Sequence, residues 1–513
     1  METPSLERGH AGARWWTDAL LAAGFGALHS LPMVWTEAWC LQMAAVGWLA
    51  WRASRVSPRR AALLGAWFGT AWVLSGTWWL YISMHRYGGL PAWLAGGAVL
   101  LLSGMLSLYL ASALAAFTRW RHGRAAPDAL RFAALWLLAE LARGQLFTGF
   151  PWVASGYAHL DGPLAALAPW VGVYGMGFVS AALAAWLVLP RPGWRSRWAL
   201  PVVGVASVLI VLKLIGPAQF TQPTGTLTLT LLQSNVAQDE KFSPQFLPKA
   251  LAWTRGQLLA ARGELVVGPE TVIPLLPDQL DPAYWQPLLA HFQQGSRAAL
   301  IGLPLGDETL GYTNSVAGVS LATVGEAGGF YRYDKHHLVP FGEFIPTGFH
   351  WFTRMMNIPL GDFNRGPLNA PSFTVKGERV APNICYEDLF GEELAGRFAD
   401  EAQAPTIFAN ISNIGWFGDT IAVDQHLNIS RMRSLEFQRP MLRATNTGAT
   451  VVIDHHGVVR HSLPPHTQGV LDADVQGRRG LTPFARWAAA LGLWPLAALA
   501  LLLVLGLSRR PAP

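Results

Sequence analysis

Charged residues are scarce in this chain of 513 residues. They make up 14% of it, against about 25% in an ordinary soluble domain, and 51% of the residues are hydrophobic. This deficit argues against a wholly soluble protein and predicts segments that cross a membrane. The long uncharged runs lie within 15–217 and 484–507, whereas 218–483 has the mixed composition of a soluble domain large enough to bury its own core.

Cysteine is scarcer still, with Cys40 in an apolar segment and Cys385 in the soluble part. Two cysteines so placed argue against a disulfide framework, and no Cys/His spacing typical of a zinc site occurs. A cleavable leader pattern is also lacking, so the first apolar run is expected to remain as an anchor. The net charge of +6 comes largely from arginines in short patches between apolar runs, which is typical of membrane orientation signals. We therefore expect no metal, no cofactor and no nucleic-acid partner.

Eight segments are apolar and long enough to cross the hydrocarbon core of a bilayer, which takes about 20 helical residues. They are 15–34, 35–51, 61–82, 90–117, 127–147, 164–190, 198–216 and 485–507. His29, Pro32 and Glu37 interrupt the first two, which could instead form one re-entrant unit. The clearest is the sixth, because it contains no charge at all.

Lys and Arg are concentrated in alternate loops between these segments, as the positive-inside rule expects of the cytoplasmic side. Loops 52–60, 118–126 and 191–197 hold four, three and three arginines, and Arg509 and Arg510 follow the last span, whereas loops 83–89 and 148–163 hold only Arg86. Seven spans then precede the soluble domain, which places it in the periplasm of a bacterium, with a cytoplasmic C-terminus in the inner membrane. The expected domains are 1–217 (transmembrane), 218–483 (soluble) and 484–513 (last helix and tail).

Residues 218–483 alternate short β-rich runs with turn residues and helical stretches, the pattern of a layered α/β domain. We expect strands at 227–233, 265–267, 299–303, 314–320, 329–333, 379–384, 406–410, 441–445, 450–454 and 469–472. We expect helices at 245–262, 281–295, 388–402 and 424–438. The expected fold class is therefore a multi-span α-helical membrane domain joined to an α/β soluble domain.

Three of these strands end at side chains that make a chemically sensible set, namely Glu270, Lys335 and Cys385. Functional groups converge at strand ends in open α/β sheets. A thiol needs a base to become a nucleophile, and the tetrahedral intermediate it forms needs a cation or N–H donors on its oxyanion. Each residue alone has an ordinary structural interpretation, as core, surface or turn. Their joint occurrence favours a nucleophilic active site.

The motifs around these residues resemble those of the apolipoprotein N-acyltransferases, a membrane-embedded branch of the nitrilase superfamily, over nearly the whole chain. They are Pro269-Glu270, the stretch KHHLVPFGEFIP from Lys335 to Pro346, Ile384-Cys385-Tyr386-Glu387, the stretch from Asn410 to Asn413, Trp416-Phe417-Gly418, Arg143-Gly144 and the stretch from Thr148 to Trp152. Two positions depart from the family pattern. Gly268 stands where a large aromatic residue is more frequent, and Phe242 where a tryptophan is expected.

The resemblance implies an αββα nitrilase-like soluble domain and a ping-pong acyl transfer. An acyl chain would pass from a membrane phospholipid, phosphatidylethanolamine in this family, to Cys385 as a thioester. It would then pass to the free α-amino group of a diacylglyceryl-cysteine on an apolipoprotein, which completes lipoprotein maturation.

The resemblance also implies roles for individual residues. Glu270 would be the general base, Lys335 would stabilise the oxyanion together with the backbone N–H after Cys385, and Glu343 and Glu387 would support them. The expected substrate-binding residues are Phe242, Asn314, Tyr386, Asn413, Trp416 and Phe417.

Two other functions remain open at this stage. A membrane-anchored amidase of the nitrilase type would use the same three residues and resolve the thioester with water. A transport protein or non-catalytic lipoprotein-binding protein would have lost the activity, although its Glu, Lys and Cys are intact.

Several local features also have two interpretations. The pairs His336-His337 and His455-His456 suggest a metal, but paired histidines in a strand point to opposite faces. The apolar run from 344 to 356 is either core or an arm that dips into the outer leaflet. Trp416-Phe417 is either core or a mobile lid. Glu140 and Arg143 form either a local ion pair or a site near the lipid headgroup.

Overall fold

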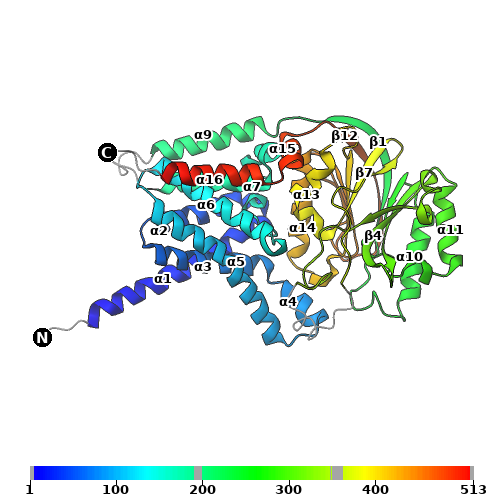
Figure 1. Cartoon of the computed structure of the whole chain (residues 1–513), viewed down its shortest axis with the longest axis horizontal. Coiled ribbons are helices and arrows are strands. Elements are labelled where there is room, and N and C mark those ends of the chain that lie inside the picture. Colours follow the sequence, from blue (N-terminus) through cyan, green and yellow to red (C-terminus); the bar gives the residue numbers. More distant parts are fainter. Residues whose placement is uncertain (1–4, 190–198, 347, 349–361, 509–513) are drawn as a thin grey trace. The chain divides into compact units, whose positions relative to one another are not determined.

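The computed structural model describes residues 5–189, 199–346, 348 and 362–508 (Figure 1). The chain divides into two compact units. The helical unit consists of Met1–Trp78, Trp93–Ala218 and Leu493–Pro513, and the α/β unit consists of Trp79–Ala92 and Gln219–Gly492. The place of Trp79–Ala92 in the α/β unit was not expected, because this stretch follows an apolar segment of the helical part.

The helical unit has a helix at each of the eight apolar segments. These are α1 (Ser5–Ser30), α2 (Trp39–Ala53), α3 (Pro58–Thr77), α5 (Ala92–Trp120), α6 (Ala125–Gln145), α7 (Ala168–Val188), α9 (Ala199–Ile215) and α16 (Trp494–Ser508), the last preceded by α15 (Pro483–Leu491) of the other unit. Among the described residues, α5 and the helix Pro163–Val188 are long and apolar enough to cross a membrane, with a third if the bent pair α15–α16 counts as one span. The number of spans therefore stays a prediction.

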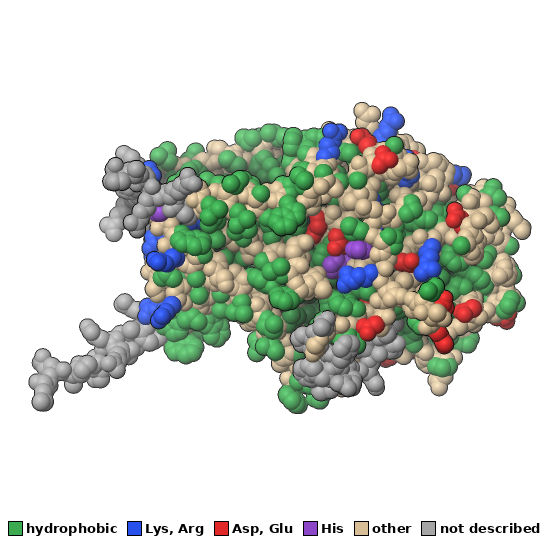
Figure 2. Space-filling view, viewed as in Figure 1, with side chains coloured by type: hydrophobic (Ala, Val, Ile, Leu, Met, Phe, Trp, Pro, Cys, Tyr) green, Lys and Arg blue, Asp and Glu red, His purple; other side chains and the backbone are tan. Residues whose placement is uncertain are grey.

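The helical unit exposes many hydrophobic side chains and buries some polar and charged ones. Hydrophobic side chains cover much of the surface of this unit in Figure 2, and large ones such as Trp93, Leu101 and Leu214 are exposed. The ion pair between Glu140 and Arg143 (3.4 Å) is buried inside the unit. Hydrogen bonds from the backbone and hydroxyl of Ser155 also reach Glu140, so the pair ties two segments together. Exposed hydrophobic side chains of this kind are what a lipid environment favours.

Two of the arginine-rich loops and the last helix meet at one end of the helical unit. Thr118 near the end of α5 donates a hydrogen bond to the carbonyl of Ala53 at the end of α2 (3.3 Å). His122 after α5 contacts the carbonyl of Leu507 in α16 (2.9 Å). The loops 54–57 and 121–124 and the end of α16 therefore share one side. The third arginine loop, with Arg191, Arg195 and Arg197, and the residues Arg509 and Arg510 lie outside the described residues.

Two mixed six-stranded sheets form the α/β unit, in the orders β12-β1-β2-β3-β4-β5 and β11-β10-β9-β8-β7-β6. The strands are β1 (Gln222–Gln233), β2 (Leu265–Val267), β3 (Ala298–Asp307), β4 (Gly311–Val319), β5 (Tyr331–Asp334), β6 (Phe373–Val375), β7 (Glu378–Ile384), β8 (Ile407–Ser412), β9 (Met441–Thr445), β10 (Val451–Ile453), β11 (Val459–Ser462) and β12 (Gly469–Arg479). In each sheet, parallel pairs at the centre (β1-β2-β3 and β7-β8-β9) are flanked by antiparallel pairs.

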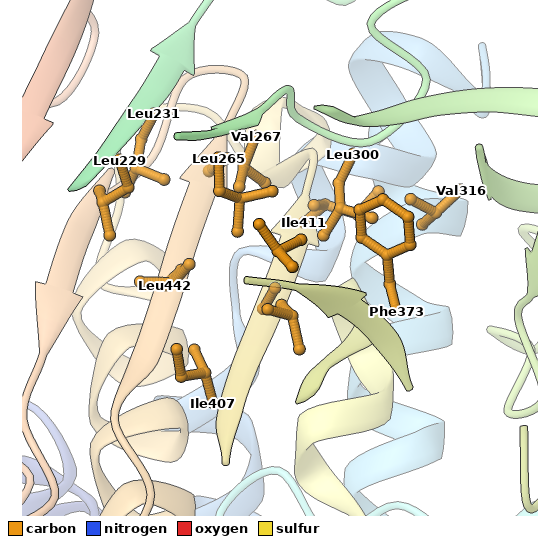
Figure 3. Packing of buried hydrophobic residues seen from close by; sticks show 14 of the residues in the cluster. Leu229, Leu231, Leu265, Val267, Leu300, Val316, Phe373, Ile407, Ile411 and Leu442 are labelled. Carbon is orange, nitrogen blue, oxygen red and sulfur yellow. The ribbon is translucent and has the colours of Figure 1, made fainter. Parts of the chain in front are cut away.

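The two sheets pack face to face through one hydrophobic core. Leu229, Leu265 and Leu300 of the first sheet meet Ile411 and Leu442 of the second in this core (Figure 3). Alternate residues of the first sheet, such as Val266 and Ile301, point the other way and pack against α10 (Leu247–Ala260) and α11 (Pro282–Gln293). Because successive residues of a strand face opposite sides, one strand serves both interfaces.

The second sheet is covered on its outer face in the same way. Phe408 of β8 contacts Phe437 at the end of α14 (Ala422–Phe437), with ring centroids 5.5 Å apart, and Phe437 contacts Phe484 of α15. The layers are thus helix, sheet, sheet and helix, which confirms the expected αββα fold. The helix expected at 388–402 is instead the short α13 (Gly391–Ala395) with 3-10 turns on either side. Gly391 and Gly396 lie so close to Arg433 and Asn369 that a Cβ would not fit at either position.

Candidate active site

Glu270 lies three residues after the end of β2, and it is buried. Its Oε1 accepts a hydrogen bond from Asn314 Nδ2 (2.7 Å), and its Oε2 accepts one from the backbone N–H of Asn413 (2.8 Å). The loop passes close over Gly302 of β3, where a Cβ would lie 2.9 Å from Glu270 Cα and 2.8 Å from Thr271 N. Two donors therefore hold the carboxylate in one orientation, and the position of its backbone depends on a glycine.

Lys335 directly follows β5 and is buried beside two carboxylates. Its Nζ donates a hydrogen bond to Glu343 Oε1 (2.8 Å) and lies 3.6 Å from Glu270 Oε1. Asn314 Nδ2 also donates to Glu343 (2.7 Å), so one cation and one amide bridge both carboxylates. Burial alone would lower the pKa of Lys335, but Glu343 and Glu270 outweigh it and raise the pKa above its usual value. Lys335 is therefore an ammonium group at neutral pH.

Cys385 stands at the end of β7 in a left-handed backbone conformation, with φ 52°. This conformation is uncommon for a residue other than glycine and costs on the order of 1–3 kcal/mol. Glu387 holds the turn, because its Oε2 accepts hydrogen bonds from Ile384 N (2.6 Å) and Tyr333 OH (2.7 Å) and its Oε1 accepts one from His336 N (2.7 Å). Tyr333 and His336 flank the active-site lysine. Glu387 thus ties the turn of the thiol to the strand end that carries the lysine.

The thiol of Cys385 is protonated in this arrangement. Although the residue keeps some accessible surface, desolvation of the sulfur raises its pKa, and the carboxylates of Glu270 and Glu343 raise it further. Lys335 and the backbone N–H of Asn413 act in the opposite direction without overcoming them. The site therefore holds a protonated thiol on which the charges of two carboxylates and one ammonium group act.

A second buried network supports the backbone of Cys385. Its carbonyl accepts hydrogen bonds from His426 (3.1 Å) and from Asn410 Nδ2 (3.2 Å). Asp388 lies 3.1 Å from the same nitrogen of His426 and 3.4 Å from Arg443. Burial alone would raise the pKa of Asp388, but His426 and Arg443 keep it below its usual value. These groups support the strained turn, and Asn410 holds the backbone of Cys385.

The Gly302 contact predicts a large effect for a single methyl group. Gly302→Ala should destabilise the protein by about 1–3 kcal/mol, because backbone atoms of Pro269, Glu270 and Thr271 would have to move. Displacing Glu270 should also lower the rate of Cys385 acylation by about 10²-fold. Gly256→Ala in α10 is the matched control, since a Cβ there meets nothing within 4 Å. Equal acylation rates for the two variants, measured with labelled phospholipid, would contradict the positional role of Gly302.

The other residues expected to bind substrate differ in burial and in their contacts with the site. Asn413 joins the site, and its side chain also contacts Gln238 (2.7 Å) and Asn446 (3.0 Å). Tyr386 is buried, with its ring against Phe390 (5.3 Å between centroids). Phe242, in contrast, is about one-third exposed.

Trp416 and Phe417 are half-buried beside Trp79–Ala92, the segment that joins the α/β unit. Phe417 contacts Trp79 (4.3 Å between ring centroids), and Trp416 contacts Tyr87 (5.7 Å). Trp79 also donates a hydrogen bond to Gln425 of α14 (3.1 Å). The aromatic pair is therefore covered by a segment more than 300 residues away in sequence.

Sequence reasoning missed Lys241, which is buried and donates a hydrogen bond to the backbone carbonyl of Glu270 (2.9 Å). It also missed the group beneath Cys385 formed by Asp388, His426 and Arg443. The one sequence signal for Lys241 is its position next to Phe242, an expected substrate-binding residue. Burial of charged side chains depends on tertiary contacts that a local pattern does not contain.

No group of three or more His, Cys, Asp or Glu side chains is arranged to hold a metal ion in the part of the chain that the structure describes. His336 and His337 have separate partners, the carbonyl of Gly366 (2.8 Å) and the carboxylate of Glu393 (2.9 Å). His455 and His456 lie in a turn, not in a strand, with ring centroids 3.9 Å apart. His336 and His337 also lie outside a strand, after the end of β5, so the expectation that each pair points to opposite faces of a strand was wrong. Most of the apolar run from 344 to 356 lies outside the described residues.

Comparison with known proteins covers both units. Residues 25–187 match the apolipoprotein N-acyltransferase N-terminal domain, and residues 243–483 match the carbon-nitrogen hydrolase family. A relative from Verminephrobacter eiseniae named apolipoprotein N-acyltransferase is 53% identical over 93% of this chain and 94% of its own length. Relatives with the same name from Ralstonia nicotianae and Bordetella bronchiseptica are 48% and 41% identical, over 94% and 95% of this chain and 93% and 97% of their own lengths. The chain belongs to the apolipoprotein N-acyltransferase family, with a nitrilase-like catalytic domain.

Proposed function

We propose that this membrane protein moves an acyl chain from a phospholipid to the N-terminal α-amino group of a diacylglyceryl-cysteine on an apolipoprotein, through a thioester on Cys385. The observation that carries the proposal is the buried cluster of Glu270, Lys335 and Glu343, joined through Glu387 to the strained turn of Cys385. Such a cluster supplies a base, a cation and a nucleophile. Phosphatidylethanolamine is the proposed donor.

In the first half-reaction, the Cys385 sulfur attacks the ester carbonyl of the phospholipid while Glu270 takes the thiol proton. Lys335 stabilises the oxyanion that forms on the carbonyl oxygen. When the intermediate collapses, the ester C–O bond breaks and Glu270 returns the proton to the leaving alkoxide. The products are a thioester and a lysophospholipid.

In the second half-reaction, the free α-amino group of the acceptor attacks the thioester carbonyl. Glu270 takes a proton from the amine, Lys335 again stabilises the oxyanion, and the C–S bond breaks. The proton returns to the sulfur, which regenerates the thiol and leaves an amide. Asn314 Oδ1 is buried and has no partner among the described residues, so it is available to accept a hydrogen bond from the acceptor amine.

We place the α/β unit in the periplasm and the C-terminus in the cytoplasm. The support is that the loops 54–57 and 121–124 and the end of α16 share one end of the helical unit, as the positive-inside rule expects of the cytoplasmic side. The helices α3, α5 and α16 connect to the α/β unit through their opposite ends. A site held at the bilayer surface avoids extracting acyl chains, which costs about 0.8 kcal/mol per CH₂.

Transfer can be tested with purified protein in detergent, acyl-labelled phosphatidylethanolamine and a diacylglyceryl-cysteine peptide with a free N-terminus. We expect one labelled acyl chain per peptide and an equal amount of lysophospholipid, measured by mass spectrometry. The same peptide with an acetylated N-terminus is the control and should accept none. Release of the label only as free fatty acid would overturn the proposal in favour of an amidase-type hydrolase. Complete absence of turnover would favour a non-catalytic protein.

A further inference from the structure

Lys241 is a buried lysine outside the set of three residues that perform the proposed chemistry. It lies in the segment between β1 and α10, and only 6% of its surface is accessible. Its Nζ donates a hydrogen bond to the backbone carbonyl of Glu270 (2.9 Å). No other described residue accepts a hydrogen bond from this ammonium group, so its charge is not matched by a carboxylate in direct contact.

The segment that carries Lys241 is fastened to the active site at two points. Gln238 Oε1 accepts a hydrogen bond from Asn413 Nδ2 (2.7 Å), and the backbone N–H of Asn413 donates to the carboxylate of Glu270 (2.8 Å). Lys241 contacts the carbonyl of the same glutamate. A closed ring of contacts therefore surrounds Glu270, with its backbone held by Lys241 and its carboxylate held by Asn413.

The charges of the site balance only when Lys241 is counted. Glu270 and Glu343 are two buried carboxylates that share one cation, Lys335. With Lys335 alone, the group carries one net negative charge, and a thiolate or an oxyanion would add to it. With Lys241, the four side chains are neutral. Glu387 accepts hydrogen bonds from three backbone N–H groups and a tyrosine, and the charges of Lys335 and Arg397 also act to lower its pKa against the effect of burial.

We propose that Lys241 is a positioning residue of the catalytic centre, which fixes Glu270 through its carbonyl and offsets the negative charge that opposes ionisation of Cys385. The proposal rests on the proposed function for the roles of Glu270 and Cys385. The electrostatic interactions of Lys241 with Glu270 and Cys385 support this role. Burial lowers the pKa of Lys241 to about 8, while Glu270 and Cys385 act to raise it, so the lysine interacts with both reacting groups. A buried charge near a reacting centre acts strongly because water does not screen it.

The test uses the reactivity of the thiol and needs no lipid. In a Cys40→Ser background, where Cys385 is the only cysteine, the rate constant of alkylation by iodoacetamide is measured from about pH 6 to 10. Lys241→Met should slow alkylation about tenfold below about pH 8, the size expected for loss of one charge in a protein interior, and the difference should shrink at higher pH, where Lys241 loses its proton. Lys241→Arg should recover much of the rate. Lys249→Met, at an exposed position of α10, is the matched control and should leave it unchanged.

The pH profile must be interpreted with every group that faces Lys241. These are Glu270 and Cys385, whose charges act on Lys241, and Lys335 and Glu343, which act on the same thiol. Asp239, two residues away in sequence, is at the surface in an ion pair with Arg86 (3.9 Å). Circular dichroism and melting temperature show whether each variant is folded.

Identical profiles for Lys241→Met and Lys249→Met, both folded, would overturn the proposal. If Lys241→Met does not fold, Lys241→Gln, which keeps a donor but not the charge, is compared with Lys241→Arg. Equal rates for these two would also overturn it. Because the assay contains no lipid, its result is independent of whether acyl transfer occurs, and failure of the proposed function would show only in the transfer assay.

Discussion

Glu270→Gln should lower the rate of Cys385 acylation by about 10²–10⁴-fold, the usual contribution of a general base. Glutamine has the same shape but cannot take the thiol proton. It also places an amide NH₂ against one of the two donors, Asn314 Nδ2 or the Asn413 backbone N–H, which costs about 1–3 kcal/mol of stability. The variant should therefore fold, with a melting temperature a few degrees lower, but acylate Cys385 very slowly.

A second readout separates loss of the base from loss of structure. The Glu270 carboxylate raises the pKa of the Cys385 thiol, so its removal should lower that pKa and increase the thiolate fraction at a given pH. Alkylation by iodoacetamide should then become faster while acylation by phospholipid becomes slower. Glu308→Gln, at an exposed position, is the control and should change neither rate. Undiminished acylation in Glu270→Gln would remove Glu270 from the role of base.

Lys335→Met should have the largest effect on stability among these variants and should also lower the rate. The ammonium group is 1% exposed and compensates Glu343 at 2.8 Å and Glu270 at 3.6 Å. Removing one partner of a buried ion pair costs about 3–5 kcal/mol, because the remaining charges stay buried without compensation. In addition, the variant lacks the cation proposed to stabilise the oxyanion, so its acylation rate should be lower by about 10²–10³-fold, the effect of losing one oxyanion donor.

The stability of Lys335→Met should depend on pH, because the variant leaves Glu270 and Glu343 buried without the cation that lies between them. Repulsion between two buried carboxylates destabilises the folded state at neutral pH, and acid relieves it. The deficit in melting temperature relative to wild type should shrink between about pH 8 and pH 5. Lys376→Met, which removes an exposed ion pair with Glu264, should cost less than about 1 kcal/mol and serves as control. A pH-independent deficit would contradict this account.

Local sequence patterns predicted most elements of the α/β unit because its strands are short, β-rich and bounded by turn residues. The strand expected at 441–445 has the bounds of β9, and the ends of most others differ by a few residues. The strands β6 and β11 were missed. They lie at the two edges of one sheet, have only three and four residues, and depend on pairing with a neighbour more than on their own composition.

Strand ends were the informative signal for the site. Glu270, Lys335 and Cys385 were expected together because each closes a strand, and the structure brings the first two within 3.6 Å and couples both to the thiol. The left-handed turn at Cys385 was not predictable, since no glycine marks it. Lys241 was not predicted either, because no local pattern marks it. Its burial depends on a contact with the Glu270 backbone 29 residues away.

Counting apolar residues predicted where the helices of the helical unit lie, but not their lengths or the polar groups that they bury. Each expected span has a helix, but α2 and α9 have only 15 and 17 residues, and α6 contains the buried ion pairs of Asp128 with Arg131 and of Glu140 with Arg143. Helices that pack polar residues inward look less apolar than a lipid-facing helix of the same length. Trp79–Ala92 joins the α/β unit because Trp79 and Tyr87 pack against Phe417 and Trp416, which hydropathy does not reveal.

The covalent intermediate is the most direct test of the central claim. Purified protein is mixed with acyl-labelled phosphatidylethanolamine without acceptor, and its intact mass is measured before and after neutral hydroxylamine. The account predicts one acyl group per chain, removed by hydroxylamine, mapped to Cys385, present in Cys40→Ser and absent in Cys385→Ala. An acyl group that survives in Cys385→Ala, or wild-type protein that transfers acyl chains without ever carrying one, would contradict it.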